Sequence, residues 1–228
     1  MTKIFQVGGS VRDAILGVKS KDIDFAVEAE SFDAMREVIL ARGGKIFLET
    51  PEFLTIRANV PELGSADYVL CRKDGAYSDG RRPESVTVGK ISDDLARRDF
   101  TMNAMAIDME TKLGLDPHNG LADIVGKLIS CVGDAKTRME EDKLRAFRAV
   151  RFAVTKGFTI EAKTEDAIRA LAPESFDAVS TERIREELLK MFTSDSYDSF
   201  DMLFNRFLNL GEVVRRREIW FVPTTKSK

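Results

Sequence analysis

Hydrophobic and polar positions follow two different patterns along the chain. Up to residue 131, short apolar runs are separated by polar or glycine-rich connections, which is typical of strands mixed with helices. The expected strands are 4–7, 22–27, 45–48, 53–60, 67–71, 106–109 and 127–131. The expected helices are 11–16 with Ser10 as its cap, a helix from the cap Ser31 to about Ala41, and 92–105. This order predicts an α/β domain with a mixed sheet.

From Asp134 onward, apolar residues recur three and four positions apart, as in amphipathic helices. The expected helices are 143–155, 163–171, 181–192 and 197–210. We therefore expect an α/β head domain at 1–131 and a helical domain at 132–228. The polar stretch 72–83 predicts a mobile loop, and 223–228 predicts a frayed tail.

Composition limits the functions that the chain can have. Of its 228 residues, 43% are hydrophobic, and the formal net charge is −3, so any contact with nucleic acid needs a local basic surface. No apolar run approaches the ~20 residues of a membrane span, so we expect no membrane partner. Cys71 and Cys131 are the only cysteines, and we expect reduced thiols and a cytoplasmic location.

The first candidate for chemistry is the glycine turn after the first strand. Gly8 and Gly9 let backbone N–H groups approach a phosphate, and the helix capped by Ser10 points its positive end there. Arg12, one turn further, could clamp a phosphate oxygen with two hydrogen bonds. Taken alone, a Gly-Gly turn is a weak signal.

The second candidate is the pair Asp22 and Asp24. Alternate residues of a strand face the same side, so these carboxylates should point together, with Ile23 and Phe25 in the core. A divalent cation relieves their repulsion, and Mg²⁺ takes one or two carboxylates plus phosphate oxygens. An isolated Asp-x-Asp is common on surfaces, but its combination with the glycine turn favours a catalytic site. Asp67, on a strand expected beside this pair, is a third candidate carboxylate that could bind metal or act as a base, or could equally cap a strand end.

Five motifs carry a resemblance to a known family. They are VGGSVRD at 7–13 with KDIDF at 21–25, RRDFTMNA at 97–104, DPHNGLADI at 116–124, EDKLR with RFA at 141–153, and TERIREEL at 181–188. In this order they resemble the head and neck domains of class II tRNA nucleotidyltransferases (CCA-adding enzymes) and bacterial poly(A) polymerases. The resemblance implies a head of the nucleotidyltransferase (polymerase beta-like) superfamily, followed by an all-α neck.

The resemblance also implies roles for individual residues. Arg98, Asp99 and Asn103 match a ribose- and nucleotide-recognition motif. The helix after residue 141 matches one that serves as a protein template for the incoming nucleotide, and 181–188 matches a motif that braces it. Mg²⁺ would be the cofactor.

The template helix can also be analysed from its spacing. Asp142, Arg145, Arg148 and Arg151 form a ridge of neighbours, away from an apolar face that includes Phe147. Asp142 and Arg145 should lie farthest from the core and reach a ligand. For the ridge as a whole, and for Arg151 most of all, surface ion pairs are the alternative.

A carboxylate only accepts hydrogen bonds and a guanidinium only donates them. The pair Asp142 and Arg145 therefore fits the edges of cytosine and adenine and excludes uracil and guanine. CTP and ATP are the expected substrates, added to the 3′ acceptor end of tRNA or of another small RNA.

The choice within the family rests on two further features. The stretch 52–57 lacks the Gly-Arg-Arg-Phe-like signature of poly(A) polymerases, which favours CCA addition. The chain stops soon after Leu210, so the body and tail domains of full-length relatives are expected to be missing or truncated, and a partner or a homodimer could replace them. CC-addition, A-addition, poly(A) tailing and a catalytically silent binding module stay open as alternatives.

Overall fold

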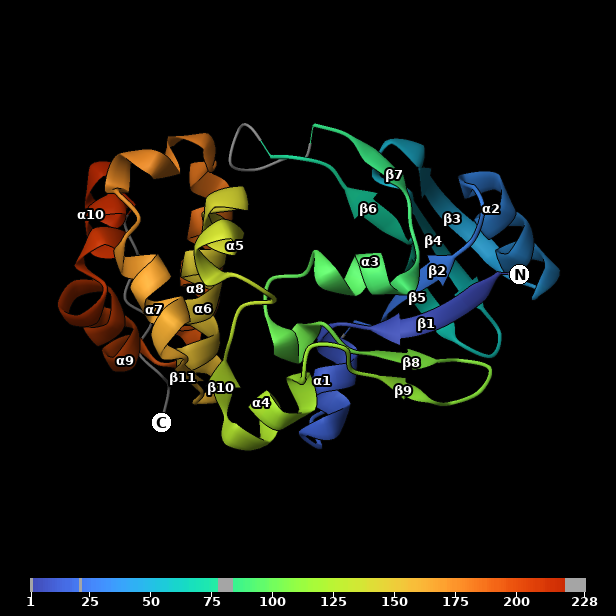
Figure 1. Ribbon diagram of the computed structural model, residues 1–228, viewed down its shortest axis with the longest axis horizontal. Coiled ribbons are helices and arrows are strands. Elements are labelled where there is room, and N and C mark those ends of the chain that lie inside the picture. The colour runs from blue at the N-terminus through green and yellow to red at the C-terminus, as the bar shows by residue number, and fades with distance from the viewer. Residues whose placement is uncertain (1, 21, 78–83, 220–228) are drawn as a thin grey trace. The chain divides into compact units, whose positions relative to one another are not determined.

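The computed structural model describes residues 2–20, 22–77 and 84–219. These residues form two compact units. The first comprises 2–20, 22–76 and 84–125, and the second comprises 77 and 126–219. The contacts therefore divide between Val125 and Gly126, and the domain boundary after residue 131 stays a prediction. Figure 1 shows the elements in chain order.

The first unit is built on a seven-stranded sheet of order β3-β4-β5-β2-β1-β8-β9. Its strands are β1 Lys3–Val7, β2 Asp24–Glu28, β3 Lys45–Thr50, β4 Thr55–Val60, β5 Gly64–Leu70, β8 Ala106–Asp108 and β9 Gly114–Leu115. β2 and β5 run parallel, and the other neighbours are antiparallel. The sheet is thus mixed, as predicted. A separate hairpin joins β6 Arg72–Asp74 to β7 Val86–Val88.

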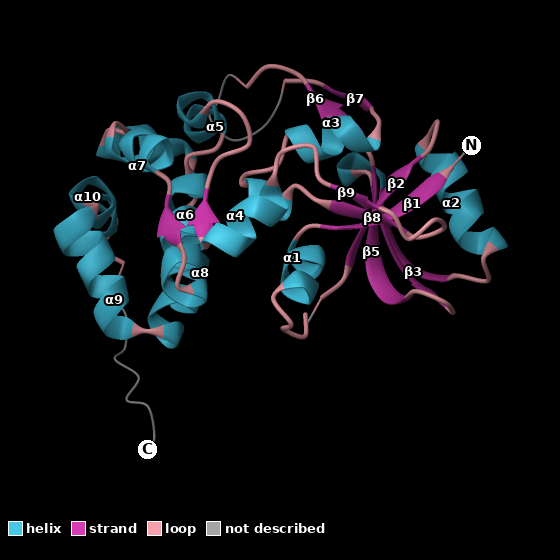
Figure 2. Cartoon of the chain, turned by 60° about the horizontal axis from the view of Figure 1, so that its bottom comes forward, coloured by secondary structure: helices cyan, strands magenta, loops and turns pink. Residues whose placement is uncertain are grey.

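Helices cover both faces of this sheet (Figure 2). They are α1 Gly9–Ile15, α2 Phe32–Ala41 and α3 Ile91–Ala96, and a further helix, α4 Gly120–Gly126, follows the last strand. Met35 and Ile39 of α2 pack on one face with Phe25 and Tyr68, whose rings stack. On the opposite face, Leu95 of α3 packs in a second cluster with β1 and β8. Burial of these side chains on both faces stabilises the sheet that carries the acidic residues.

Several local expectations for the first unit are wrong. Ser10 does not cap α1, because the helix starts at Gly9, and the Ser10 hydroxyl donates to the Val7 carbonyl at 3.0 Å. The expected helix 92–105 ends at Ala96 and resumes only as a 3₁₀ turn at Thr101–Asn103. There the Asp99 carboxylate accepts the N–H of Phe100, which offers the backbone an alternative to the helix.

Two more segments differ from expectation. β6 lies inside the stretch expected to be a loop, whose residues 78–83 lie outside the described residues. The strand expected at 127–131 is the short β10 Leu128–Ile129, which pairs with β11 Thr159–Ile160 instead of joining the large sheet. Ser31, by contrast, caps α2 as predicted, since its hydroxyl accepts the Ala34 N–H at 3.0 Å.

The second unit is helical apart from the ladder of β10 and β11. Its helices are α5 Ala135–Glu141, α6 Leu144–Lys156, α7 Ala162–Arg169, α8 Thr181–Ser194, α9 Ser196–Asp201 and α10 Leu208–Arg216. The helix expected at 197–210 is divided into α9, a π-helical turn at Met202–Arg206 and the start of α10. α5 was not predicted. The expected fold class, an α/β nucleotidyltransferase head followed by a helical domain, is confirmed.

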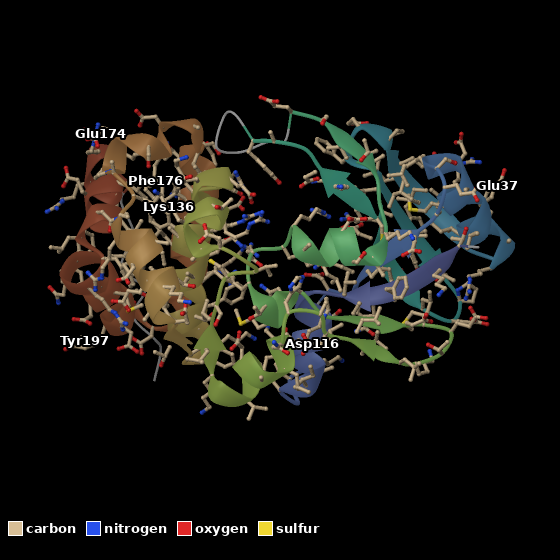
Figure 3. All side chains as sticks on the ribbon, viewed as in Figure 1. Glu37, Asp116, Lys136, Glu174, Phe176 and Tyr197 are labelled. Atoms are coloured by element: carbon tan, nitrogen blue, oxygen red, sulfur yellow. The ribbon has the colours of Figure 1, made fainter. Side chains whose placement is uncertain are left out.

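Aromatic packing holds the second unit together. Phe147 of α6 and Phe176 of a 3₁₀ turn are buried, with ring centroids 5.5 Å apart at 81°, an edge-to-face contact. Figure 3 shows Phe176 inside this unit and Tyr197 at its surface. Leu144 and Val150 of α6 are also buried, as predicted for the apolar face of that helix.

Candidate functional site

Three aspartates line one hollow on the first unit's sheet, where residues of β2, β3, β4 and β5 contribute to its wall. The hollow has a volume of about 610 Å³, and Asp22, Asp24 and Asp67 contribute to its wall together with Arg57 and the exposed Phe47. β2 begins only at Asp24, so Asp22 lies just before the strand. Ile23 is exposed, which corrects the expectation that it enters the core, whereas Phe25 is buried as predicted.

Asp24 lies where its negative charge is disfavoured. Partial removal of water around the carboxyl raises its pKa above the ordinary value of 3.8, the positive charge of Arg98 lowers it, and the carboxylates of Asp67 and Asp22 raise it further. Within the described part of the chain, the side chains of Asp22 and Asp24 have no hydrogen-bond or ion-pair partner. The net effect is a carboxylate pair whose repulsion Arg98 relieves only in part.

Asp67 is adjacent to Asp24, since the two are partners in the parallel register of β5 and β2. Arg57, across the antiparallel β4–β5 pair, donates to both oxygens of the Asp67 carboxylate at 2.7 and 2.8 Å. This ion pair lowers the pKa of Asp67. Sequence reasoning placed Asp67 beside the pair but missed Arg57.

The carboxylates of this hollow fit a divalent cation that takes part of its ligands from the protein and the rest from a substrate. Over 2–20, 22–77 and 84–219, no three His, Cys, Asp or Glu side chains are grouped closely enough to hold a metal ion alone. Asp22 and Asp24 therefore offer a pair, and Asp67 is held by Arg57. Mg²⁺ ordinarily binds through one or two carboxylates and completes its shell with phosphate oxygens and water.

The glycine turn lies against two guanidinium groups. A Cβ at Gly8, whose φ is +72°, would come within 2.8 Å of an Arg98 nitrogen, and one at Gly9 within 3.4 Å of an Arg12 nitrogen. A second hollow of about 300 Å³ is lined by Arg98 and Arg97 as well as by Asp24 and Asp67. Positive charge thus lies next to the carboxylates, as an anionic substrate with a bound cation requires.

The predicted nucleotide-binding residues of this unit form one hydrogen-bonded network. The Arg12 guanidinium donates to Asp13 at 3.0 and 2.9 Å and to the Asn103 side-chain oxygen at 2.5 Å. The Asn103 amide in turn donates to Asp99 at 3.0 Å. Arg12, Asp99 and Asn103 are all buried, so they hold the glycine turn to the 97–104 segment. Direct contact of Arg12 with a phosphate stays a prediction.

Asp94, which sequence reasoning missed, orients the arginines of the second hollow. Its carboxylate is almost fully buried and accepts from Arg98 at 2.8 and 3.2 Å and from Arg97 at 3.0 Å. Burial alone would raise the pKa of Asp94, but Arg98 and Arg97 outweigh it and the pKa is lowered. Its spacing of three and four residues from the arginines on a helix was the signal that could have identified it.

In the second unit, Asp142 and Arg145 are not on an exposed ridge. Asp142 follows α5 in an extended conformation, and its carboxylate accepts the Leu144 N–H at 3.1 Å and Arg183 at 3.0 Å. Arg145 is only 7% exposed, and it donates to Glu141 at 2.8 Å and to the Arg138 carbonyl at 2.9 Å. The expectation that both lie farthest from the core is wrong.

Arg148 and Arg151 of α6 lie against a buried carboxylate of α8. The Glu187 carboxylate accepts from Arg151 and lies 3.9 Å from an Arg148 nitrogen. The Arg151 guanidinium also covers the Phe152 ring at 3.8 Å from its centroid. Arg183 and Glu187 are therefore the bracing residues of α8 that the structure shows, whereas Glu182, Arg185 and Glu186 are exposed. Glu187 was quoted in the motif but given no role.

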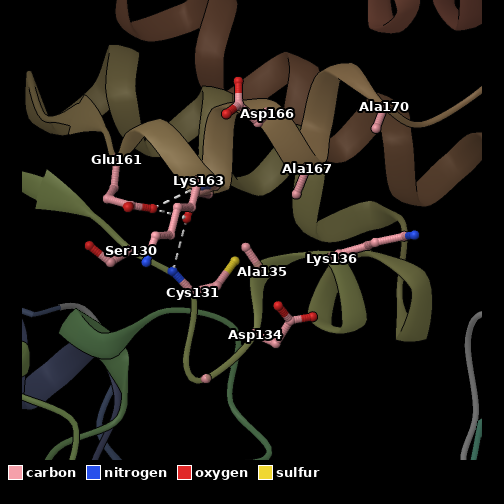
Figure 4. A pocket seen from close by; sticks show the side chains of 12 residues that line it. Ser130, Cys131, Asp134, Ala135, Lys136, Glu161, Lys163, Asp166, Ala167 and Ala170 are labelled. Carbon is pink, nitrogen blue, oxygen red and sulfur yellow. Dashed lines mark hydrogen bonds between the residues drawn. The ribbon is translucent and has the colours of Figure 1, made fainter.

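A different hollow of the second unit does not include these residues. It has a volume of about 670 Å³ and lies between the starts of α5 and α7, where Cys131 and Lys163 contribute to its wall (Figure 4). Thr164 is fully buried beneath it, accepting the Cys131 N–H and donating to Glu161. Asp134 and Glu161 cap the two helices from within the chain.

Comparison with known proteins identifies both units. Residues 4–130 match the family described as Poly A polymerase head domain, and 157–208 match one described as probable RNA and SrmB-binding site of polymerase A. A CCA-adding enzyme of Lactobacillus johnsonii is 39% identical over 189 residues, covering 81% of this chain and 45% of the relative. The CCA-adding enzyme of Geobacillus stearothermophilus is 41% identical, with 81% and 44% covered.

Solved structures agree with these matches. The Bacillus stearothermophilus CCA-adding enzyme in complex with CTP has a TM-score of 0.75 and 31% identity, over 89% of this chain and 47% of that one. The Thermotoga maritima enzyme complexed with tRNA has a TM-score of 0.74 and 25% identity, over 97% and 50%. The chain spans less than half the length of the curated relatives it matches.

One remaining expectation concerned membranes and cysteines. None of the helices in the described part of the chain has the length and apolar character that crossing a membrane requires. Cys71 and Cys131 are both buried and free.

The motifs, the fold and the matched relatives agree, and the chain belongs to the nucleotidyltransferase family of the CCA-adding enzymes and poly A polymerases.

Proposed function

We propose that this chain carries the catalytic and base-selecting parts of an enzyme that adds C and A residues from CTP and ATP to the 3′ end of tRNA, with release of pyrophosphate. The named relatives are CCA-adding enzymes, and solved neighbours hold CTP or tRNA. The observation that carries the proposal is the pair of uncompensated carboxylates, Asp22 and Asp24, beside a glycine turn lined by Arg98 and Arg12.

The chemistry is assigned to the head, proposed as residues 1–131. Enzymes of this family use a divalent metal ion, and we propose Mg²⁺ held by Asp22 and Asp24, with Asp67 as a further ligand. When bound, it would lower the pKa of the attacking 3′-hydroxyl and neutralise charge on the leaving pyrophosphate. Gly8, Gly9 and Arg98 bind the triphosphate, and the network of Arg12, Asp99 and Asn103 fixes the turn and the sugar side of the nucleotide. Ser10 contributes to the turn through its hydrogen bond to the Val7 carbonyl.

Base selection is assigned to the helical domain, proposed as residues 132–228. Asp142 accepts from the amine of cytosine or adenine, and Arg145 donates to the ring acceptors. Arg183 and Glu141, which hold these side chains, restrict them to one geometry. A rigid pair penalises a mismatched edge more than a mobile one, because it cannot rearrange to satisfy uracil or guanine. A cytoplasmic location stays a prediction.

The test is incorporation of single labelled nucleotides into tRNA that lacks its 3′ end, with Mg²⁺ present. Addition of two C residues from CTP, followed by one A from ATP and then arrest, supports the proposal. Runs of A without arrest would replace it with poly(A) tailing. Absence of incorporation into any RNA by the folded chain would contradict it.

A further inference from the structure

One ion pair lies beside the proposed metal site, in the hollow lined by Asp22, Asp24 and Asp67, which we call the acidic hollow. Arg57 and Asp67 are cross-strand neighbours on β4 and β5, and the Arg57 Nε donates to Asp67 Oδ1 at 2.7 Å while Nη2 donates to Oδ2 at 2.8 Å. The Arg57 side chain is 59% exposed and that of Asp67 is 30% exposed. The pair thus lies at the mouth of the hollow and not in the core.

We propose that Arg57 is a positioning residue that competes with the divalent ion for Asp67, so that the free enzyme binds the ion through Asp22 and Asp24 and gains Asp67 only when Arg57 is released. This inference rests on the proposed function of the same hollow. In this view Arg57 lowers the affinity of the free enzyme for the divalent ion, below the affinity that the three carboxylates would have without it.

The two partners of Asp67 compete for the same carboxylate. The bidentate guanidinium takes one lone pair on each carboxylate oxygen, so a metal ion cannot bind both oxygens from that side while Arg57 is in place. Asp67 lies next to Asp24 in register, so the same carboxylate that Arg57 holds faces the proposed metal site. The positive charge of the Arg57 guanidinium beside that site also repels the divalent ion.

Release of Arg57 requires little reorganisation. An exposed ion pair contributes only a modest free energy, because water solvates the separated charges well. Arg57 lies on an edge of the hollow that is open to solvent, so its long side chain can turn away without leaving a buried charge. The pair therefore acts as a removable counter-ion, unlike the buried pair of Glu187 and Arg151.

The experiment measures divalent-ion binding without nucleotide. Mn²⁺ binding is followed by electron paramagnetic resonance, and Mg²⁺ binding by the rise in melting temperature. We expect Arg57→Gln, which keeps length and polarity but removes the charge, to bind about three- to tenfold more tightly than wild type. Arg36→Gln is the matched control, since Arg36 donates to Glu49 at 2.8 Å with exposures of 46% and 33% but lies outside the hollow.

Asp67→Asn separates competition at Asp67 from a general charge effect. In that background, Arg57→Gln should yield less than half of its gain in affinity, because the contested carboxylate is gone. An unchanged affinity in Arg57→Gln, or a full gain that persists with Asp67→Asn, would overturn the inference while leaving the metal site intact. A wild-type protein that binds neither ion, even with CTP added, would instead refute both this inference and the proposed function.

Discussion

Charged side chains have few partners in the hollow of the first unit that Asp22 and Asp24 line, but they are paired around the α6 arginines of the second unit. Asp22 and Asp24 have no ion-pair partner among the described residues, and partial burial, together with the neighbouring carboxylates, raises the pKa of Asp24 although Arg98 lowers it. Arg145 and Arg151 are each held by a carboxylate, Glu141 and Glu187. The protein gives the first pair of carboxylates no ion-pair partner among the described residues, whereas it gives each of these two arginines a carboxylate partner.

This difference indicates which task each region is built for. A site that binds a cation and a triphosphate gains free energy when the ligand neutralises charges that repel each other in its absence. A site that reads a base edge needs side chains that stay in one orientation, and internal ion pairs provide that. We therefore expect substitutions in the first region to change chemistry, and those in the second to change stability and selectivity.

The largest expected effect is on catalysis. Asp24→Asn keeps the shape of the side chain but removes a proposed metal ligand, so incorporation of labelled CTP should fall by about 10³-fold or more. Glu37→Gln, an exposed acidic residue of α2, is the control and should retain wild-type turnover (Figure 3). Comparable turnover in Asp24→Asn would contradict the assignment of the hollow as the catalytic site.

The next effect is on stability and belongs to the second unit. Glu187→Gln removes the negative charge of the buried carboxylate that faces Arg151 and Arg148, so the attraction of both arginines to α8 is weakened. We expect the free energy of unfolding to fall by about 2–4 kcal/mol, measured by urea denaturation. Glu186→Gln, its exposed neighbour, should change stability by less than about 0.5 kcal/mol. Equal effects of the two variants would show that Glu187 does not brace α6.

A smaller effect is expected on base choice. Arg145→Ala removes the donor that we propose to exclude uracil and guanine, so the preference for CTP over UTP should fall by about 10- to 100-fold. The ratio of kcat/KM for the two nucleotides measures this, because it cancels a uniform loss of activity. Arg185→Ala makes the same change at an exposed position of α8 and should leave the ratio unaltered. Continued exclusion of UTP by Arg145→Ala would refute the template role.

The smallest effect is on the stability of the first unit and has the opposite sign from that at Glu187. The folded state raises the pKa of Asp24 above 3.8, so its charged form is disfavoured on folding. That destabilisation grows as pH rises through the raised pKa and is complete at neutral pH. In metal-free buffer at pH 7, Asp24→Asn should therefore melt about 1–3 °C above wild type. A lower melting temperature would mean that the carboxylate is compensated after all.

Sequence reasoning succeeded for features whose residues lie close together in the chain. The glycine turn, the pair Asp22 and Asp24, and the Ser31 cap each involve residues only one to three positions apart, and the structure contains all three features. The helix expected at 92–105 failed because the Asp99 side chain binds the backbone N–H of Phe100, which a pattern of apolar spacing does not record.

The placement of charged side chains failed for a related reason. Helical spacing put Asp142 on the same helix as Arg145, but α6 begins only at Leu144. Spacing also cannot show that a neighbouring carboxylate draws a charged residue inward, as Glu141 does with the nearly buried Arg145. A hydrophobic pattern assigns arginine to the surface by default, whereas a paired arginine can be buried.

Local periodicity and motifs of fixed spacing were enough to predict a mixed-sheet domain followed by helices, the position of the acidic pair and the glycine turn, and the family. Which charges have partners follows instead from the tertiary fold. Arg57 reaches Asp67 across a hairpin, Arg12 reaches Asn103 across the unit, and Arg151 reaches Glu187 from another helix. Such pairs depend on the path of the folded chain, since electrostatic and hydrogen-bond energies are set by distance in space and not by separation in sequence.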